Sequence, residues 1–533
     1  MLVGVPLAFL AVFFVWPVVA IIATGLRPDS GWDLSPFADV VTDRGLRATA
    51  WFTLWQAAAS TIVTLAVAMP GAYVVARFDF PGRGLLRAAI TVPFVLPTVV
   101  VASAFMALVG PRGPLGDRLD LSGTIGVILA AHAFFNSAVV VRTVGGLWSH
   151  LDPRLEDAAR MLGAGRWRAF REVTLPLLRP AITAATSIVF LFTFTSFGVV
   201  RILGENRYAT LEVEIVRTTR DLFDLPTASA LAVVQLVAVV ALLVVYGRLV
   251  ERRSVHQRLR PVAEATRRPS TRGERALLLG NLAVMALLLG TPLVVLAERS
   301  FRVGDGYGFG WYRALSTSAG TVLFVPPWEA VRNSLVYALA ATALALAVGG
   351  CAALALARPA GGRGLDTLLM LPLGTSAVTV GFGFLVALDD PPLDLRASVA
   401  LVPIAHAIVG IPFVVRTLTP VLRSIDPRLR EAAAVLGASP VRVRREVDLP
   451  IAARAGLVAA GFAFAVSLGE FGATLLLARS ARPTVPVAIF RFLGQPGPAQ
   501  FGQAMAMSTI LMVMTAAVIL AVERFRVGEF GEF

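Results

Sequence analysis

The stretch Asp152-Pro-Arg-Leu-Glu-Asp-Ala-Ala-Arg-Met-Leu-Gly-Ala164 returns later in the chain as Asp426-Pro-Arg-Leu-Arg-Glu-Ala-Ala-Ala-Val-Leu-Gly-Ala438. The copies lie 274 residues apart (426 − 152), and 15 of the 25 positions in 152–176 are identical to those in 426–450. The same offset superposes further residues: His132 on His406, Arg142 on Arg416, Phe197-Gly198 on Phe471-Gly472, and Thr210 on Thr484. This regular match indicates that one unit was duplicated and fused.

Each copy of this stretch predicts a short helix with defined ends. Asp152 and Asp426 suit the capping position, and the proline that follows each suits the first helical turn. Gly163 and Gly437 are placed to end the helix, because glycine adopts the left-handed backbone found there. The Leu-Pro pair that ends each copy is expected to mark re-entry into the membrane. The best-preserved part of the repeat is therefore a loop outside the membrane, which lipid packing alone does not explain.

The rest of the chain is too apolar for a soluble protein. Of its 533 residues, 56% are hydrophobic and 15% charged, and the mean hydropathy is +0.75, whereas soluble domains carry about 25% charged residues. The net charge of +14 comes from arginines clustered between apolar runs, so no nucleic-acid partner is expected. The single cysteine, Cys351, leaves no disulfide framework or cysteine metal cluster. The expected solvent is membrane lipid, and no metal site is predicted.

Twelve apolar runs are long enough to cross a membrane as helices, which takes about 20 residues. Each half of the chain holds six, so the two copies should have the same orientation and be related by an axis along the membrane normal. The predicted fold is an all-α integral membrane protein of about 12 transmembrane helices, arranged as two parallel six-helix repeats. The runs lie near 2–25, 52–76, 86–109, 122–146, 180–203, 228–250, 276–297, 330–357, 367–388, 397–418, 455–478 and 501–523.

Arginine-rich loops predict which side faces the cytoplasm. The segment 251–275 carries eight arginines against three glutamates, and 148–179 and 419–454 carry six and seven arginines. All three are expected on the cytoplasmic side, together with both ends of the chain. The expected organisation is a first half at 1–250, a cytoplasmic arginine-rich linker at 251–275 and a second half at 276–533.

The repeated loops at 152–176 and 426–450 closely resemble the EAA loop of membrane subunits of type I ABC importers. The second copy reads Glu431-Ala-Ala-x-x-x-Gly437, then nine residues, then Val447-x-Leu449-Pro450, and the first has Asp157 where the family usually has glutamate. In that family the loop is the coupling helix that seats on the ATP-binding subunit. The resemblance implies this role for Asp157, Ala158, Ala159, Gly163, Pro176, Glu431, Ala432, Ala433, Gly437 and Pro450.

Energy and substrate capture must then come from other chains. A Walker A loop needs a lysine to reach the phosphates, and the chain has no lysine. ATP is therefore expected to be bound by a partner chain. Neither enzyme activity nor a cofactor is expected of this chain. The resemblance implies a cytoplasmic ABC ATPase dimer, an extracytoplasmic substrate-binding protein and a location in the bacterial inner membrane. Transport would be inward by alternating access, with ATP-driven closure drawing the two coupling helices together.

Four polar residues inside predicted spans are candidates for the translocation path, because such groups are expensive in hydrocarbon. For Glu470, a structural or gating role is favoured over direct contact with a cationic substrate. His132 and His406 occupy equivalent positions, and packed, hydrogen-bonded histidines are favoured over a path-lining pair. Asn136 lies one turn after His132 and corresponds to Gly410 in the second copy, so the halves differ there.

Two short stretches of sequence indicate which substrate is expected first. Ala131-His-Ala-Phe-Phe-Asn136 and Thr210-Leu-Glu-Val-Glu-Ile215 look more like thiamine permeases than iron permeases, which puts thiamine or a related small cation first and ferric iron second. The alternative function is a 12-span secondary transporter, which would match the length but gives no reason for the duplicated loops. A membrane-embedded enzyme is a third class, and no catalytic motif with supporting partners favours it.

Overall fold

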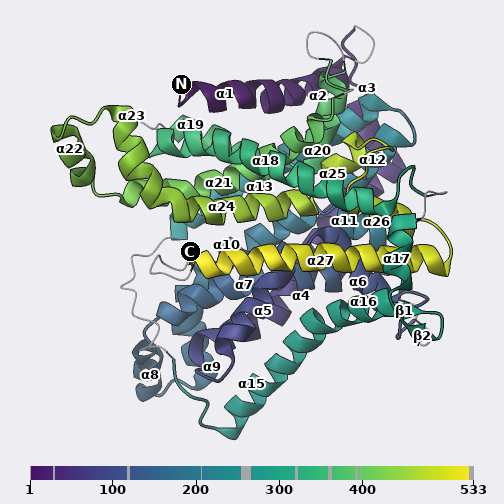
Figure 1. Ribbon diagram of the computed structural model, residues 1–533. Helices are drawn as coiled ribbons and strands as arrows, with labels where there is room; N and C mark the ends of the chain where they lie inside the picture. Colours follow the sequence, from purple (N-terminus) through teal and green to yellow (C-terminus); the bar gives the residue numbers. More distant parts are fainter. Residues whose placement is uncertain are drawn as a thin grey trace.

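The computed structural model describes residues 2–27, 31–116, 121–205, 207–253, 266–317, 322–357, 363–389, 394–396 and 398–526. These residues are almost entirely helical, apart from one small antiparallel hairpin of strands β1 (Arg302–Val303) and β2 (Gly306–Tyr307) (Figure 1). Residues 254–265, in the predicted linker, lie outside the described residues. On either side of them, α13 runs to Arg253 and α15 begins at Arg272. The boundaries of the two halves stay a prediction.

Within the described residues, ten helices are long and apolar enough to cross a membrane, and two bent helix pairs raise the number to twelve. This confirms the predicted all-α membrane fold. The first six are α1–η1–α2 (Gly4–Leu10, Ala11–Val15, Trp16–Leu26), α4 (Arg44–Arg77), α5 and α6 (Arg83–Val95, Thr98–Val109), α7 (Ile125–His150), α9–η2–α10 (Arg166–Ala169, Phe170–Thr174, Leu175–Phe194) and α13 (Leu225–Arg253). The second six are α15–η3–α16 (Arg272–Met285, Ala286–Gly290, Thr291–Phe301), α18 (Pro327–Leu356), α19 and α20 (Arg363–Gly374, Ala377–Ala387), α21 (Leu401–Ser424), α23–η4–α24 (Pro440–Val443, Arg444–Asp448, Leu449–Gly469) and α27 (Pro498–Arg526).

Shorter helices connect these spans. They are α3 (Ser35–Thr42), α8 (Arg154–Met161), α11 (Gly198–Leu203), α12 (Leu211–Arg220), α17 (Gly310–Thr317), α22 (Pro427–Val435), α25 (Gly472–Leu477) and α26 (Val485–Leu493). The predicted spans 180–203 and 455–478 therefore run too far, since helices end at Phe194 and Gly469 and new short helices follow. Hydropathy misses these breaks because the residues on both sides are apolar.

Each of the four π-helical segments among the described residues ends two residues before a proline. The prolines are Pro17, Pro176, Pro292 and Pro450. Proline lacks an N–H and its ring clashes with the carbonyl four residues earlier, and a wider π turn moves that carbonyl away. The Leu-Pro pairs predicted to mark re-entry thus lie inside continuous helices, which begin earlier at Arg166 and Pro440.

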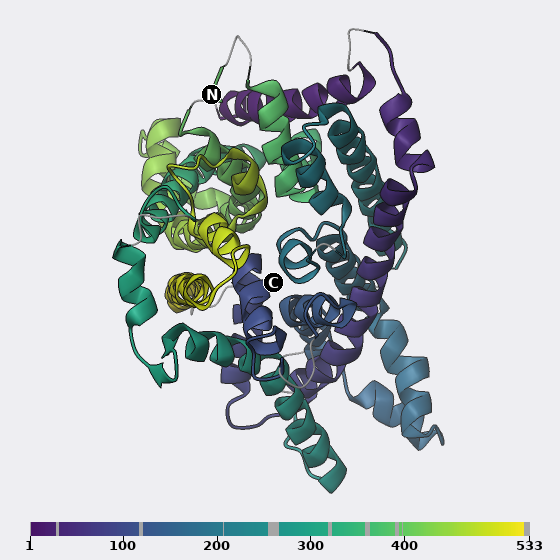
Figure 2. The same ribbon diagram turned by 90° about the vertical axis from the view of Figure 1, so that its right-hand side faces the viewer.

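The first span of each half packs against the other half. Helix α2 lies on α20 and α13, and α16 lies on α6 and α27, so the equivalent contacts are made twice. Figure 2 shows the purple N-terminal helices along the green second half and the teal helices of 272–317 along the blue first half. Gly383 of α20 lets α2 approach closely, since a Cβ there would come within 2.9 Å of Pro17.

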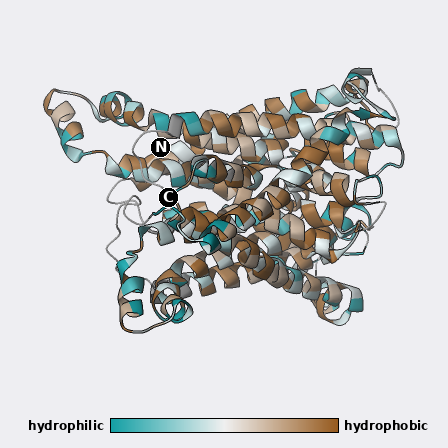
Figure 3. Ribbon diagram, turned by 90° about the horizontal axis from the view of Figure 1, so that it is seen from below, coloured by the Kyte–Doolittle hydropathy of each residue, from teal (hydrophilic) through white to brown (hydrophobic). Residues whose placement is uncertain are grey.

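The two ends of the bundle carry different elements. Helices α8, α9, α22 and α23 project from the end where α1 begins and α27 ends (Figure 1), and Figure 3 shows hydrophilic residues gathered on these projections. Helices α11, α12, α20, α25 and α26 lie toward the opposite end.

Candidate functional site

The helices α8 and α22, each with the turn that follows it, form two hairpins of the same construction. Asp152 Oδ1 accepts the N–H of Arg154 at 3.0 Å, and Asp426 Oδ1 accepts the N–H of Arg428 at 2.9 Å. Both helices end at a glycine in the left-handed conformation, with φ of 92° at Gly163 and 83° at Gly437. The N–H groups of Ala164 and Ala438 bond back to Ala159 and Ala433, which completes a Schellman motif in each copy. The predicted C-terminal ends are confirmed in both copies, and Asp426 caps α22 as predicted. Helix α8 starts at Arg154 with Pro153 as its N-cap, one residue later than predicted.

Each hairpin exposes a large apolar tip. Met161 and Leu162 are 89% and 90% exposed, and the equivalent Val435 and Leu436 are 87% and 88% exposed. Apolar side chains so fully exposed, at equivalent places on two projecting helices, mark an interaction surface. Of the predicted coupling residues, Ala159, Ala433 and Pro176 are partly buried, and the other seven are exposed: Asp157, Ala158, Gly163, Glu431, Ala432, Gly437 and Pro450.

One polar contact fixes each hairpin to the helix that follows, with different chemistry in the two copies. Thr174 Oγ1 donates to Glu156 Oε2 at 3.2 Å in the first copy. At the equivalent positions of the second copy, Arg430 Nε donates to Asp448 Oδ1 at 2.8 Å, and Arg430 also bonds to the carbonyl of Leu422. A polar contact between these two positions is therefore present in both copies, although the residue pair differs.

We expect R430A to loosen the second hairpin by ~2 kcal/mol, because the nearly buried Asp448 carboxylate would lose its charged donor. The measurement is the rate of limited proteolysis between α22 and α23 in detergent-solubilised protein. T174A, at the matched contact of the first copy, should have an effect of about half that size, since it removes one neutral donor. Equal cleavage rates for R430A and the wild type would contradict this role.

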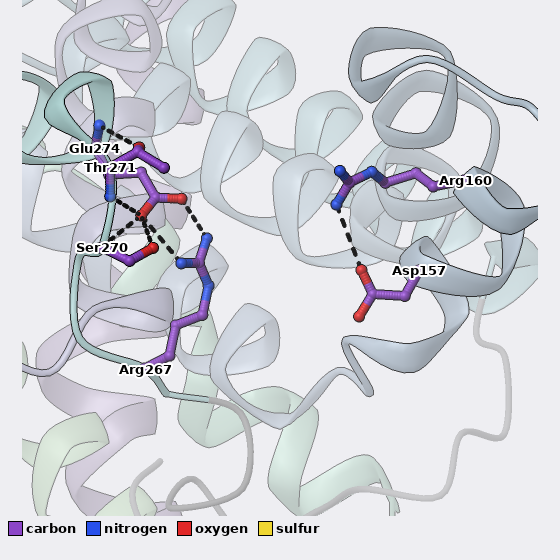
Figure 4. Close-up of polar contacts among 6 residues, drawn as sticks. All are labelled: Asp157, Arg160, Arg267, Ser270, Thr271 and Glu274. Carbon is purple, nitrogen blue, oxygen red and sulfur yellow. Dashed lines mark hydrogen bonds and ion pairs between the residues drawn. The ribbon is translucent and has the colours of Figure 1, made fainter.

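The end of the linker is anchored beside the first hairpin (Figure 4). The backbone of Arg267 pairs with that of Phe78 just beyond α4, and its guanidinium forms an ion pair with Glu274 at 2.5 Å. Glu274 also completes a capping box with Thr271 at the start of α15. The hydrogen bond to Glu274 is the main cause that raises the pKa of Arg267, and the Asp157 carboxylate of α8 adds to it. Asp157 itself pairs with Arg160 at 3.5 Å.

His132 and His406 are both buried, and both ring nitrogens of each are hydrogen-bonded. His132 bonds through Nδ1 to Ser60 Oγ and through Nε2 to Ser196 Oγ, both at 2.8 Å. His406 bonds through Nδ1 to Ser467 Oγ and through Nε2 to Thr474 Oγ1, both at 2.7 Å. Both histidines thus join a span to the break that follows α10 or α24.

Glu470 caps a helix at one of these breaks. Its carboxylate accepts the N–H groups of Ala473 at 2.8 Å and Thr474 at 2.9 Å, at the start of α25, and lies 3.1 Å from His406 Nε2. Asn136 donates to the carbonyl of His132 at 3.0 Å, and its Oδ1 has no hydrogen-bond partner within the described part of the chain. No group of three or more His, Cys, Asp or Glu that could hold a metal ion occurs among the described residues.

Two phenylalanines meet between the two halves. Phe197 and Phe471, which the repeat superposes, stack with ring centroids 5.2 Å apart, and each begins a short helix after a break. Gly198 and Gly472 follow them, and a Cβ at these positions would meet Thr98 of α6 at 2.4 Å and Val378 of α20 at 2.9 Å. The internal repeat superposes Phe197 on Phe471, but nothing in the sequence shows that the two rings are in contact.

Glu212 is a second residue that the sequence did not single out. It is 0% exposed in α12, where its oxygens accept from Gln235 Nε2 of α13 and from Ser376 Oγ of the second half. In the sequence Glu212 is one of several acidic residues between two apolar runs, so hydropathy predicts that it lies in an exposed loop.

The chain is similar to membrane subunits of transport systems. The family described as "binding-protein-dependent transport system inner membrane component" matches residues 68–256. A probable ABC transporter permease protein, y4fN, of Sinorhizobium fredii is 28% identical over 93% of this chain and 90% of its own length. The thiamine transport system permease protein ThiP of Brucella abortus is 29% identical over 98% and 94% of the two chains. The sulfate transport system permease protein CysT of Escherichia coli is 32% identical over 45% of this chain and 88% of its own.

Proposed function

Because the chain belongs to the family of inner-membrane components of binding-protein-dependent ABC importers, we propose that it carries thiamine or a related small cation inward, driven by a separate ATPase. Family membership decides between the predicted importer subunit and the alternative of a secondary transporter. The observation that supports the coupling mechanism best is the pair of equivalent hairpins with apolar tips at one end of the bundle.

A cytoplasmic ABC ATPase dimer is the proposed partner of these hairpins. Met161 and Leu162 would enter one ATPase subunit, and Val435 and Leu436 the other, since a dimer offers two equivalent grooves. The hairpin end would then be cytoplasmic, with both chain ends on that side, as the arginine-rich loops predict. A substrate-binding protein would deliver its ligand at the opposite end.

Alternating access follows from the separation of the hairpins. In Figure 1, α8 and α22 stand at opposite edges of the same end. Away from the hairpins, the rings of Phe197 and Phe471 stack between the halves, and we propose that this pair closes the path in this state. When ATP draws the ATPase subunits together, the hairpins approach, and the halves rotate so that the phenylalanine pair opens to the outside. Glu470, His406 and His132 would hold the helix breaks rigid during this motion.

Thiamine as substrate is supported by the name of a relative aligned over nearly the whole chain. The test is uptake of radiolabelled thiamine by proteoliposomes that contain the chain, its ATPase and its binding protein. We expect ATP-dependent accumulation that excess unlabelled thiamine abolishes and that ferric iron leaves unchanged. Accumulation of iron with no uptake of thiamine would contradict the proposed substrate, and ATP-independent uptake would contradict the mechanism.

A further inference from the structure

The carboxylate of Glu212 joins the two halves from a fully buried position. Glu212 stands on α12 of the first half, and Ser376 Oγ of the second half donates to its Oε2 at 2.5 Å. Gln235 Nε2, from α13 of the first half, donates to its Oε1. No ion pair to Glu212 occurs among the described residues. Burial raises the pKa of Glu212 to about 7, and the hydrogen bonds from Ser376 and Gln235 offset this only in part. We name Glu212, Gln235 and Ser376 the inter-half latch.

Ser376 extends the latch into the backbone of α20. Its Oγ accepts the N–H of Val378 at 3.0 Å and that of Thr379 at 3.4 Å, so Ser376 caps this eleven-residue helix. The Glu212 carboxyl group therefore lies close to the start of α20. If α12 and α20 separated, the Glu212 carboxyl group would lose its hydrogen-bond donor from the second half.

The latch exists on one side of the molecule only. The positions equivalent to Glu212 and Gln235, 274 residues later, hold Pro486 and Thr509. There α26 packs against α6 just as α12 packs against α20, but without a carboxylate. Since the fold builds the same packing without a buried acid, packing alone does not require Glu212.

We propose that the inter-half latch holds the outer ends of the two halves together while the coupling hairpins are apart, which makes Glu212 a positioning residue for the opening step. This rests on the proposed alternating-access function. Arg220 Nη1 of α12 also donates to the Leu475 carbonyl of the second half at 3.1 Å, so the latch acts beside a second polar contact from the same helix. Breaking Glu212–Ser376 would be part of the opening that ATP binding drives. Removing Glu212 would then shift the population toward the outward-open state before ATP binds.

The test measures how fast a cysteine at the closed centre reacts from outside. Cys351 is the only cysteine, so C351A provides a cysteine-free background into which F197C is introduced. Right-side-out vesicles containing the whole importer are treated with a membrane-impermeant maleimide. We expect E212A to raise the labelling rate about fivefold, the population change that follows from losing a buried hydrogen bond worth ~1 kcal/mol between the halves. E212Q should give an intermediate rate.

E214A is the matched control. Glu214 is 5% exposed on the same helix, and its carboxylate pairs with Arg217 of α12 at 3.2 Å instead of with the other half. E214A should therefore label at the parent rate. The double variant E212A/S376A should label no faster than S376A, because both changes remove the same contact.

A second readout separates the latch from a general packing role. In proteoliposomes without binding protein, E212A should hydrolyse ATP severalfold faster than the wild type, and E214A should not. Parent labelling rates in both E212A and E212Q, with both proteins inserted at wild-type levels, would overturn the latch. Failure of the wild type to import thiamine would overturn the proposed substrate instead, since labelling depends on neither thiamine nor hydrolysis.

Discussion

Replacing Leu162 and Leu436 together by glutamate is expected to abolish binding of the ATPase, and with it transport, without preventing membrane insertion. Both leucines are about nine-tenths exposed at the tips of the hairpins. Burying a leucine against a partner contributes ~2 kcal/mol, and a buried, unpaired carboxylate in its place costs several kcal/mol more. Over two sites, we expect a loss of at least about 1000-fold in affinity.

Co-purification of the ATPase with the tagged chain measures this effect. F223E is the matched control, because Phe223 is also 80% exposed but follows α12, away from the hairpins. F223E should retain the ATPase fully. Undiminished ATPase binding by the L162E/L436E variant would show that the hairpin tips are not the contact, and L162E and L436E alone should each give a partial loss.

Replacing Glu470 by alanine is the second change with a large expected effect, a loss of ~3 kcal/mol of stability. The variant loses the cap of α25, worth ~1 kcal/mol, and a buried contact with His406 whose removal leaves the imidazole with fewer partners. The resulting protein should denature at a markedly lower temperature in detergent, as followed by the fluorescence of its tryptophans.

S196A is the matched control in the first copy. Ser196 is equivalent to Glu470 and contacts His132 through a neutral hydroxyl, so its loss should be worth ~1 kcal/mol. E470Q retains an acceptor for the N–H groups of α25, so its loss of stability should lie between those of S196A and E470A. If E470A transports at the wild-type rate and denatures at the wild-type temperature, the proposed structural role of Glu470 is wrong.

The parts of the fold predicted from sequence are those that local physics determines. Apolar runs gave the spans, because a helix in hydrocarbon needs about 20 apolar residues whatever its neighbours are. Asp152, Asp426, Gly163 and Gly437 gave the hairpin ends, because capping and left-handed backbone depend on the residue itself. The coupling role of the hairpins came from resemblance and stays a prediction.

The features missed depend on contacts between distant residues. Nothing in the sequence near Phe197 shows that its ring stacks on Phe471 across the halves, and nothing near Glu212 shows that Ser376 reaches it. The breaks after Phe194 and Gly469 were missed because hydropathy averages over them. The one signal for Glu470 was its charge inside an apolar run, and that signal located the residue without revealing that it caps a helix.

The packing of the first span on the second half affects the order in which contacts can form during synthesis. Trp16, at the start of α2, is made 361 residues (377 − 16) before Ala377, at the start of the α20 helix on which α2 packs. At roughly 5–20 residues per second a ribosome needs about 20–70 s for that distance. During this time the α2 face that packs on α20 in the finished fold lacks that neighbour. The first span must therefore stay in the bilayer without its contact to α20 until that helix is made. The packing between the two halves forms only after most of the chain has been translated.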